Sequence, residues 1–123
     1  MNTSILIVED EAITALDLRS QLIDFGYEVG EPAGSGEEAV ERALQEKPSC
    51  ILMDINLIGD MNGIEAAETI RRACDTPIIF ITGYSNNAMR DKAMRIMPLA
   101  YLEKPVDPME VDQLLKRHYG EQR

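Results

Sequence analysis

Basic side chains are scarce in this sequence: 12 Lys and Arg residues stand against 22 Asp and Glu residues, for a formal net charge of −10. A surface that binds nucleic acid directly must neutralise phosphates, so this balance argues against direct nucleic-acid binding and against binding to anionic membranes. Long apolar runs are also absent. The longest have four to six residues, too few to span a membrane. No basic segment precedes an apolar one at the N-terminus, so no signal peptide is predicted.

Cysteine and histidine are also rare. Cys50 and Cys74 match neither the spacing of a metal site nor a disulfide framework, and each lies at the edge of an apolar segment. We therefore expect reduced structural thiols and a cytoplasmic protein. The single histidine, His118, has no Cys or acid at ligand spacing, so we expect it on the surface near the end of a helix.

Five short apolar runs recur along the chain. They are SILIV at 4–8, YEVGEPA at 27–33, CILM at 50–53, PIIFIT at 77–82 and LAYLE at 99–103. The first, third and fourth are continuous and aliphatic, which is typical of strands buried on both faces of a parallel sheet. Gly30 and Pro32 interrupt the second run, which favours an edge strand.

Segments with helical patterning separate these runs. Ser35 and Glu38 have the spacing of a capping box. Asp107 and Pro108 give an N-cap followed by proline at the first helical position. The first helix is expected to turn an apolar face that includes Phe25 toward the core. The predicted helices span Ala12–Phe25, Ser35–Glu46, Asn62–Ala73, Asn86–Met97 and Asp107 to about Tyr119.

Strand and helix therefore alternate five times, which predicts an α/β fold. The expected structure is a doubly wound parallel sheet of strand order 2-1-3-4-5, with helices on both faces and right-handed connections. The 123 residues suffice for one domain and are too few for two. We expect a single domain over residues 1–123, with its core at about 4–118.

Polar residues gather where the predicted strands end. Glu9 and Asp10 follow the first strand, Asp54 ends the third, and Thr82 and Lys104 end the fourth and fifth. In such a sheet these ends meet at one crevice. A lone acid there would be read as a helix cap, as Asp10 could be, but three close carboxylates need a cation or a proton. Oxygen ligands of this kind suit Mg²⁺.

Four short motifs at these strand ends carry a resemblance. VEDE, MDIN, FITG and YLEKP, in this order, resemble the receiver domain of two-component response regulators, whose fold is flavodoxin-like. The resemblance covers about residues 4–118. Each motif is weak alone, and the set in order on the expected strand ends is strong.

The resemblance implies a role for each acidic residue. Asp54 would be the phosphoacceptor, which takes a phosphoryl group from a phosphohistidine and forms an aspartyl phosphate. Mg²⁺ (or Mn²⁺) is the implied cofactor. Asp10 would bind it directly, Glu9 mainly through water, and Asp54 together with the backbone carbonyl of Asn56 would complete the protein ligands.

The resemblance also implies phosphoryl-binding and switch residues. Lys104 would pair with the phosphoryl group as a point charge, and the Lys104–Pro105 bond resembles the cis peptide of the family. Thr82 would donate its hydroxyl to the phosphoryl group, and Gly83 would leave room for it. Tyr101 matches the switch aromatic, which turns inward when the threonine moves toward phosphate and so gives a two-state element.

Two further features near the site are distinctive. By resemblance, Asn56 and Tyr84 occupy the positions that tune the rate of phosphate loss, and the bulk of Tyr84 predicts slow autodephosphorylation. The loop after the phosphoacceptor takes nine residues from Asp54 to Gly63, where many receivers take eight and carry a proline. Asp60 in this loop is expected to lie in a solvated turn.

The resemblance implies partners rather than substrates. The phosphodonor would be a histidine kinase or phosphotransfer protein. Phosphorylation would switch the face built from the fourth helix, fifth strand and fifth helix, which would control an output domain or partner protein. A homodimer through the same helices is an open alternative. The chain could be a stand-alone regulator, or the receiver of a longer regulator or hybrid histidine kinase.

Two other functions suit a similar sheet. An aspartate-nucleophile phosphohydrolase of the haloacid-dehalogenase kind carries a second Asp two residues after the nucleophile, where this sequence has Asn56. Flavin binding would need a hydroxyl-rich phosphate loop, which the sequence lacks. Both alternatives are therefore disfavoured.

Overall fold

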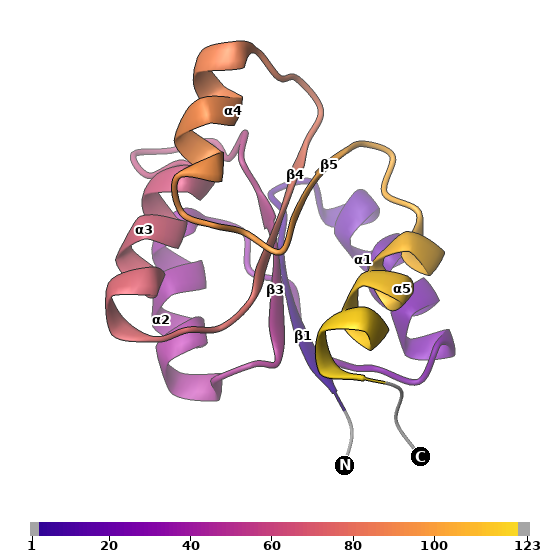
Figure 1. Ribbon diagram of the computed structural model, residues 1–123. Coiled ribbons are helices and arrows are strands. Elements are labelled where there is room, and N and C mark those ends of the chain that lie inside the picture. The colour runs from indigo at the N-terminus through magenta and orange to yellow at the C-terminus, as the bar shows by residue number, and fades with distance from the viewer. Residues whose placement is uncertain (1–2, 121–123) are drawn as a thin grey trace.

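The apolar runs form one five-stranded parallel sheet of order β2-β1-β3-β4-β5 (Figure 1). The computed structural model describes residues 3–120. Its order and its strict alternation of strand and helix confirm the predicted doubly wound fold. The strands are β1 (Ser4–Val8), β2 (Glu28–Val29), β3 (Cys50–Asp54), β4 (Ile78–Thr82) and β5 (Ala100–Glu103).

Helices cover both faces of the sheet, and each layer has its own core (Figure 1). Residues of α1 and α5 pack with one set of strand side chains, and residues of α2, α3 and α4 pack with the other. The helices are α1 (Ala12–Asp24), α2 (Gly36–Glu46), α3 (Gly63–Ala73), α4 (Asn87–Met94) and α5 (Pro108–Tyr119).

The middle strands are buried along their whole length. Every residue of β3 and of β4 is buried, because helices lie above and below them. This explains why their sequences are continuously apolar instead of alternating. The second strand is a two-residue edge strand, shorter than its apolar run, and an isolated bridge between Val8 and Ala33 prolongs its contact with β1.

Two predicted helix ends are wrong. The fourth helix ends at Met94, three residues before Met97, which adopts a left-handed conformation (φ +58°) directly before Pro98. The residue before a proline disfavours the helical conformation, so the helix cannot continue there. Phe25 lies just beyond α1, next to Gly26 (φ +100°), and is 41% exposed rather than part of the core.

One predicted capping box is only half formed. The Ser35 hydroxyl accepts a hydrogen bond from the Glu38 N–H at 3.1 Å, but the Glu38 carboxylate accepts from Gly34 N–H rather than from the N-cap. A complete box occurs at α3, where Asn62 and Glu65 each accept the other's backbone N–H at 2.9 Å. An Asn-x-x-Glu sequence therefore forms the same capping box that Ser-x-x-Glu forms at the start of other helices.

Both cysteines are free thiols, as expected. Cys50 is buried at the start of β3, and burial raises the pKa of its thiol to about 12. His118 is exposed on the last turn of α5, also as expected.

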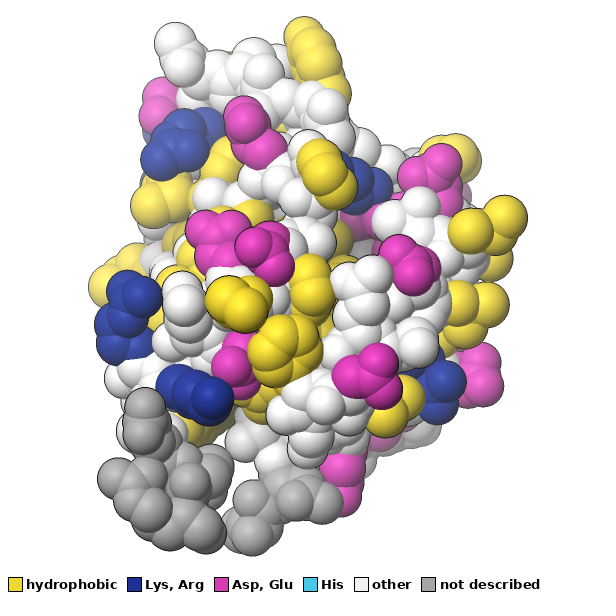
Figure 2. Space-filling view, turned by 90° about the vertical axis from the view of Figure 1, so that its right-hand side faces the viewer, with side chains coloured by type: hydrophobic (Ala, Val, Ile, Leu, Met, Phe, Trp, Pro, Cys, Tyr) yellow, Lys and Arg dark blue, Asp and Glu magenta, His cyan; other side chains and the backbone are white. Residues whose placement is uncertain are grey.

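The α1 and α5 side of the molecule presents acidic and hydrophobic side chains next to one another (Figure 2). Exposed hydrophobic residues on these two helices are Ile13, Leu16, Ile23, Met109 and Tyr119. Within residues 3–120, no helix has the length and apolar character needed to cross a membrane.

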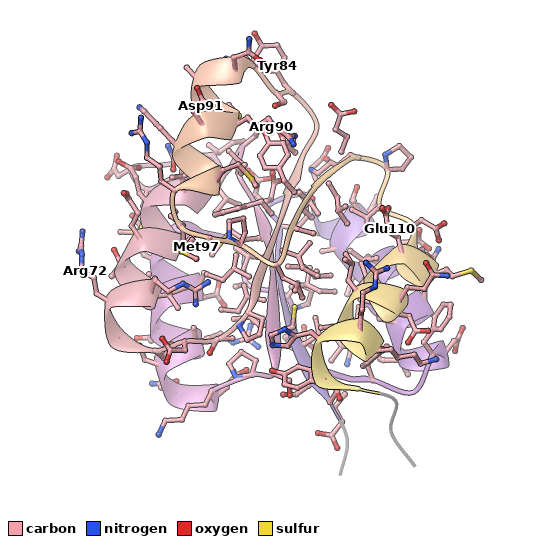
Figure 3. The ribbon with its side chains drawn as sticks, viewed as in Figure 1. Arg72, Tyr84, Arg90, Asp91, Met97 and Glu110 are labelled. Atoms are coloured by element: carbon pink, nitrogen blue, oxygen red, sulfur yellow. The ribbon has the colours of Figure 1, made fainter. Side chains whose placement is uncertain are left out.

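The backbone at Met97 generates a prediction about stability. Met97 is 83% exposed in the connection between α4 and β5 (Figure 3), and a side chain costs about 1 kcal/mol in the left-handed region. We expect Met97→Gly to raise the free energy of unfolding by up to about 1 kcal/mol, measured by urea denaturation. Met94→Gly is the matched control. It should lower stability by about 1 kcal/mol, because Met94 is helical. A loss of stability in Met97→Gly would contradict the prediction.

Candidate functional site

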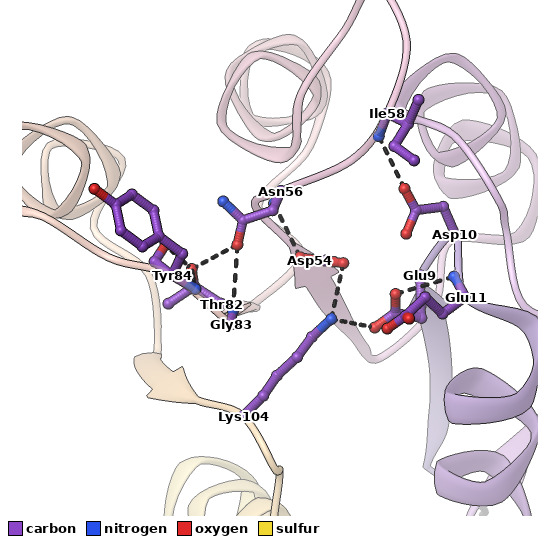
Figure 4. Close-up of polar contacts among 10 residues, drawn as sticks. All are labelled: Glu9, Asp10, Glu11, Asp54, Asn56, Ile58, Thr82, Gly83, Tyr84 and Lys104. Carbon is purple, nitrogen blue, oxygen red and sulfur yellow. Dashed lines mark hydrogen bonds and ion pairs between the residues drawn. The ribbon is translucent and has the colours of Figure 1, made fainter.

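The predicted site residues meet at the carboxyl ends of the strands (Figure 4). The register pairs Val8 with Met53 and Thr82 with Glu103, so residues just past these positions become neighbours. The residues Glu9, Asp54 and Thr82 are buried, with exposed fractions of 3%, 1% and 1%. Buried polar groups need partners, and the partners of these three come from other strands and from loops.

Lys104 supplies positive charge to this cluster. Its ammonium nitrogen lies 2.7 Å from Glu9 Oε1 and 3.1 Å from Asp54 Oδ2 (Figure 4). Burial alone would lower the pKa of Lys104, but the bonds to Glu9 and Asp54 outweigh it and the pKa is raised. The lysine therefore stays charged. The peptide bond from Lys104 to Pro105 is cis.

Glu9 remains poorly compensated despite this lysine. Its Oε2 accepts the backbone N–H of Glu11 at 3.1 Å. Within the described chain, its buried Oε1 accepts no hydrogen bond of good geometry, although the Lys104 ammonium is close. Burial raises the pKa of Glu9 to about 7, against the lowering effect of Lys104 and the Glu11 N–H, and the charge of Asp54 raises it further. Three carboxyl groups thus lie close to a single ammonium group.

The carboxylates of Glu9, Asp10 and Asp54 are arranged so that a cation fits. One oxygen from each lies within 4.8 Å of the others. The donor set consists of hard carboxylate oxygens, and such a set suits Mg²⁺. The backbone of Asn56 lies beside this cluster, because its N–H donates to Asp54 Oδ1 at 2.9 Å.

Asp10 does not cap the first helix. The N-cap of α1 is Glu11, with no side-chain capping bond. Instead Asp10 Oδ2 accepts the backbone N–H of Ile58 at 2.9 Å (Figure 4). The acid thus ties down the lengthened loop after β3, a contact that the sequence did not reveal. In the same loop Gly59 has φ +118°, and Asp60 is exposed as expected.

Gly63 allows this loop to return close to the phosphoacceptor candidate. A Cβ on Gly63 would lie 2.1 Å from the backbone oxygen of Asp54, and Gly63 N–H donates to Ile55 O at 3.1 Å. Only glycine fits this approach. The start of α3 is therefore packed directly against the end of β3.

Thr82 is held by Asn56, a contact that sequence reasoning missed. The Thr82 hydroxyl donates to Asn56 Oδ1 at 2.7 Å, and the Gly83 N–H donates to the same oxygen at 3.2 Å (Figure 4). The Tyr84 N–H donates to Thr82 Oγ1 at 3.1 Å. The loop after β3 and the loop after β4 are thus joined through one amide. The Tyr84 side chain is 68% exposed.

Tyr101 lies half-buried on β5 against the core under α2, α3 and α4. Its hydroxyl pairs with Ser85 Oγ at 2.5 Å. The Arg90 guanidinium lies 5.0 Å from the centre of the Tyr101 ring, within the range of a cation–π contact. Neither Ser85 nor Arg90 carried a sequence signal. They become visible only once α4 is placed beside β5.

Comparison with solved structures of the same architecture identifies the fold. The chain is 37% identical, with a TM-score of 0.88, to the signal receiver domain of a modulated diguanylate cyclase from Desulfovibrio desulfuricans G20, covering 95% of this chain and 93% of that one. It is 30% identical, with a TM-score of 0.85, to a CheY-like receiver domain protein from Methanospirillum hungatei JF-1, covering 96% and 94%. The fold is the CheY-like flavodoxin fold.

The sequence comparisons then give the family. Residues 5–116 match the family model of the response regulator receiver domain. The transcriptional regulatory protein PdtaR of Mycobacterium tuberculosis is 39% identical over 101 residues, which cover 82% of this chain and 49% of PdtaR. The chain therefore belongs to the response regulator receiver domain family. It spans about half the length of the first curated relatives that it matches.

The burial of Glu9 generates a prediction about pH. A carboxyl whose folded-state pKa is raised stabilises the fold below its unfolded pKa of about 4.5 and loses that contribution as pH rises toward 7. Glu9→Gln mimics the protonated form. We expect the metal-free variant to be more stable than wild type at about pH 8, by on the order of 1 kcal/mol after allowance for water access, and the gain to shrink toward about pH 5.

Urea denaturation in the presence of EDTA at the two pH values measures this difference. Glu11→Gln serves as the control, because the Glu11 side chain is exposed and its substitution leaves the backbone N–H that bonds Glu9. No gain for Glu9→Gln at the higher pH would refute the prediction.

Proposed function

We propose that this receiver domain accepts a phosphoryl group on Asp54 from a phosphohistidine of a histidine kinase or phosphotransfer protein. One observation carries the proposal. Asp54 is a buried carboxylate at the end of the central strand, bonded to Lys104 and grouped with two further acids at metal-ligand spacing. A purely structural role would not require this concentration of negative charge.

In the proposed transfer, a carboxylate oxygen of Asp54 attacks the phosphorus. The bond from phosphorus to the imidazole nitrogen of the donor breaks, and the imidazole leaves with the electron pair. The Asn56 N–H and the Lys104 ammonium, which contact the two oxygens of Asp54, hold the carboxylate in place. Lys104 also offsets charge on the phosphoryl oxygens.

Glu9, Asp10, Asp54 and the backbone carbonyl of Asn56 would hold Mg²⁺. When bound, the ion offsets the negative charge that gathers around the transferring phosphoryl group. Three carboxylate oxygens within 4.8 Å of one another, close to the single ammonium of Lys104, support this assignment.

The conformational response would begin at Thr82 and Gly83 and end at Tyr101. Thr82 ends β4 and Gly83 begins the loop that leads into α4, and Tyr101 is linked to that loop through Ser85. A ligand shifts such an equilibrium only through different contacts in the two states. The face built from α4, β5 and α5 would report the change to an output domain or partner protein.

The first test is the phosphoryl adduct itself. We expect acetyl phosphate with Mg²⁺ to add the mass of one phosphoryl group per chain, and Asp54→Asn to abolish the adduct because it removes the nucleophile. Asp75→Asn, an exposed acid after α3, is the matched control and should be phosphorylated normally. Intact-mass spectrometry reads all three proteins.

Two results would count against the proposal. One is an adduct that persists in Asp54→Asn. The other is steady turnover of unrelated phosphate esters, which would favour the aspartate-nucleophile phosphohydrolase instead.

The second test concerns Tyr84, which we propose slows hydrolysis of the aspartyl phosphate by excluding water. The Tyr84 ring lies on the far side of Thr82 from Asp54 (Figure 4), so shielding requires it to turn inward after phosphorylation. Tyr84→Ala should lose phosphate severalfold faster, followed as decay of the adduct over time. Tyr84→Phe keeps the bulk and should stay slow. An unchanged rate in Tyr84→Ala would remove this role.

A further inference from the structure

The side-chain oxygen of Asn56 accepts two hydrogen bonds from the neighbouring strand end. Thr82 Oγ1 lies 2.7 Å from it and Gly83 N lies 3.2 Å from it. These donors are 26 and 27 residues from Asn56 in the sequence. The two donors therefore converge on one point, and Asn56 occupies that point.

The identities of the neighbouring atoms fix the orientation of the amide. A backbone N–H only donates, so the Asn56 atom that faces Gly83 must be the amide oxygen. The contact from that oxygen to Thr82 Oγ1 then needs the hydroxyl proton. Thr82 has a single proton, and the carbonyl oxygen of Tyr84 also lies within hydrogen-bonding distance of it. The hydroxyl is thus fully engaged by acceptors of the protein itself.

This network lies beside the phosphoacceptor. The Asn56 N–H donates to Asp54 Oδ1 at 2.9 Å, so the residue that holds Thr82 and Gly83 also contacts Asp54. A phosphoryl group on Asp54 would present oxygens of higher charge than an amide oxygen, and charged acceptors make the stronger hydrogen bonds. The same two donors cannot serve both acceptors fully.

We propose that the Asn56 side chain is an internal stand-in for the phosphoryl group, and that it stabilises the unphosphorylated form. Asn56 acts as a positioning residue through Thr82 and Gly83. The proposal rests on the proposed function of Asp54 and adds its regulation. Because the phosphoryl group must displace the amide, the amide weakens phosphoryl binding by the free energy of the contacts that are lost.

Beryllofluoride, a non-covalent phosphoryl analogue, tests this at equilibrium and without hydrolysis. We expect Asn56→Ala to bind beryllofluoride with Mg²⁺ roughly three- to tenfold more tightly than wild type, the range expected for one or two lost hydrogen bonds. Fluorine NMR titration measures the affinity. Asn56 is exposed, so its truncation removes little packing. Asn87→Ala, an exposed asparagine at the start of α4, is the matched control and should match wild type.

A double-mutant comparison separates the proposed route from a general effect. In a Thr82→Val background the hydroxyl is absent, so the gain from Asn56→Ala should fall by about half or more, with only the Gly83 N–H left to release.

Equal or weaker beryllofluoride binding in Asn56→Ala overturns the proposal, and so does a gain of the same size in the Thr82→Val background. Failure of the proposed function looks different. In that case wild type shows no beryllofluoride binding that depends on Asp54, and Asp54→Asn behaves like wild type.

Discussion

The ammonium group of Lys104, held between two buried carboxylates, is the contact on which the carboxyl edge of the sheet depends. Glu9 follows β1 and Asp54 ends β3, and the register of these adjacent strands places the two residues side by side. Without a cation, their carboxylates would repel at short range. Lys104 follows β5, which β4 separates from β3. One side chain therefore joins the ends of three strands. A buried ion pair of this kind adds little net stability, but losing one partner would leave a buried charge uncompensated.

The sheet and the grouping at its edge could be predicted from the sequence for a simple reason. Burial on both faces requires continuous apolar runs, so the runs CILM and PIIFIT in the sequence predict β3 and β4. Parallel strands place their carboxyl ends at one edge. Residues that end these strands in the sequence, such as Asp54, Thr82 and Lys104, can therefore be predicted to lie close together. The fold and the family are confirmed, while the chemical roles of these residues stay predictions.

Contacts made by loops could not be predicted, because they depend on backbone dihedrals and rotamers rather than on periodicity. The bond from the Ile58 N–H to Asp10 exists because the lengthened loop turns at Gly59. Likewise Ser85 meets Tyr101 only through the path of the chain after β4. The early end of α4 is a different case, since Pro98 is visible in the sequence and disfavours a helical conformation at Met97, the residue to which the helix is predicted to run.

Most donors of the site have acceptors within the protein itself, which in the proposed function makes the site suited to switching. Carboxylates pair with the Lys104 ammonium, and the Asn56 amide oxygen accepts hydrogen bonds from Thr82 and Gly83. The Ser85 hydroxyl is hydrogen-bonded to the Tyr101 hydroxyl. In the proposed function, the oxygens of a phosphoryl group would compete for these donors, because charged acceptors make the stronger hydrogen bonds. The acid cluster retains more negative charge than Lys104 offsets, and this favours a cation. In the proposed function, a cation that neutralises Glu9 would free the lysine to turn to a phosphoryl group. In the proposed reaction, metal binding would thus prepare the same ammonium that phosphorylation then uses.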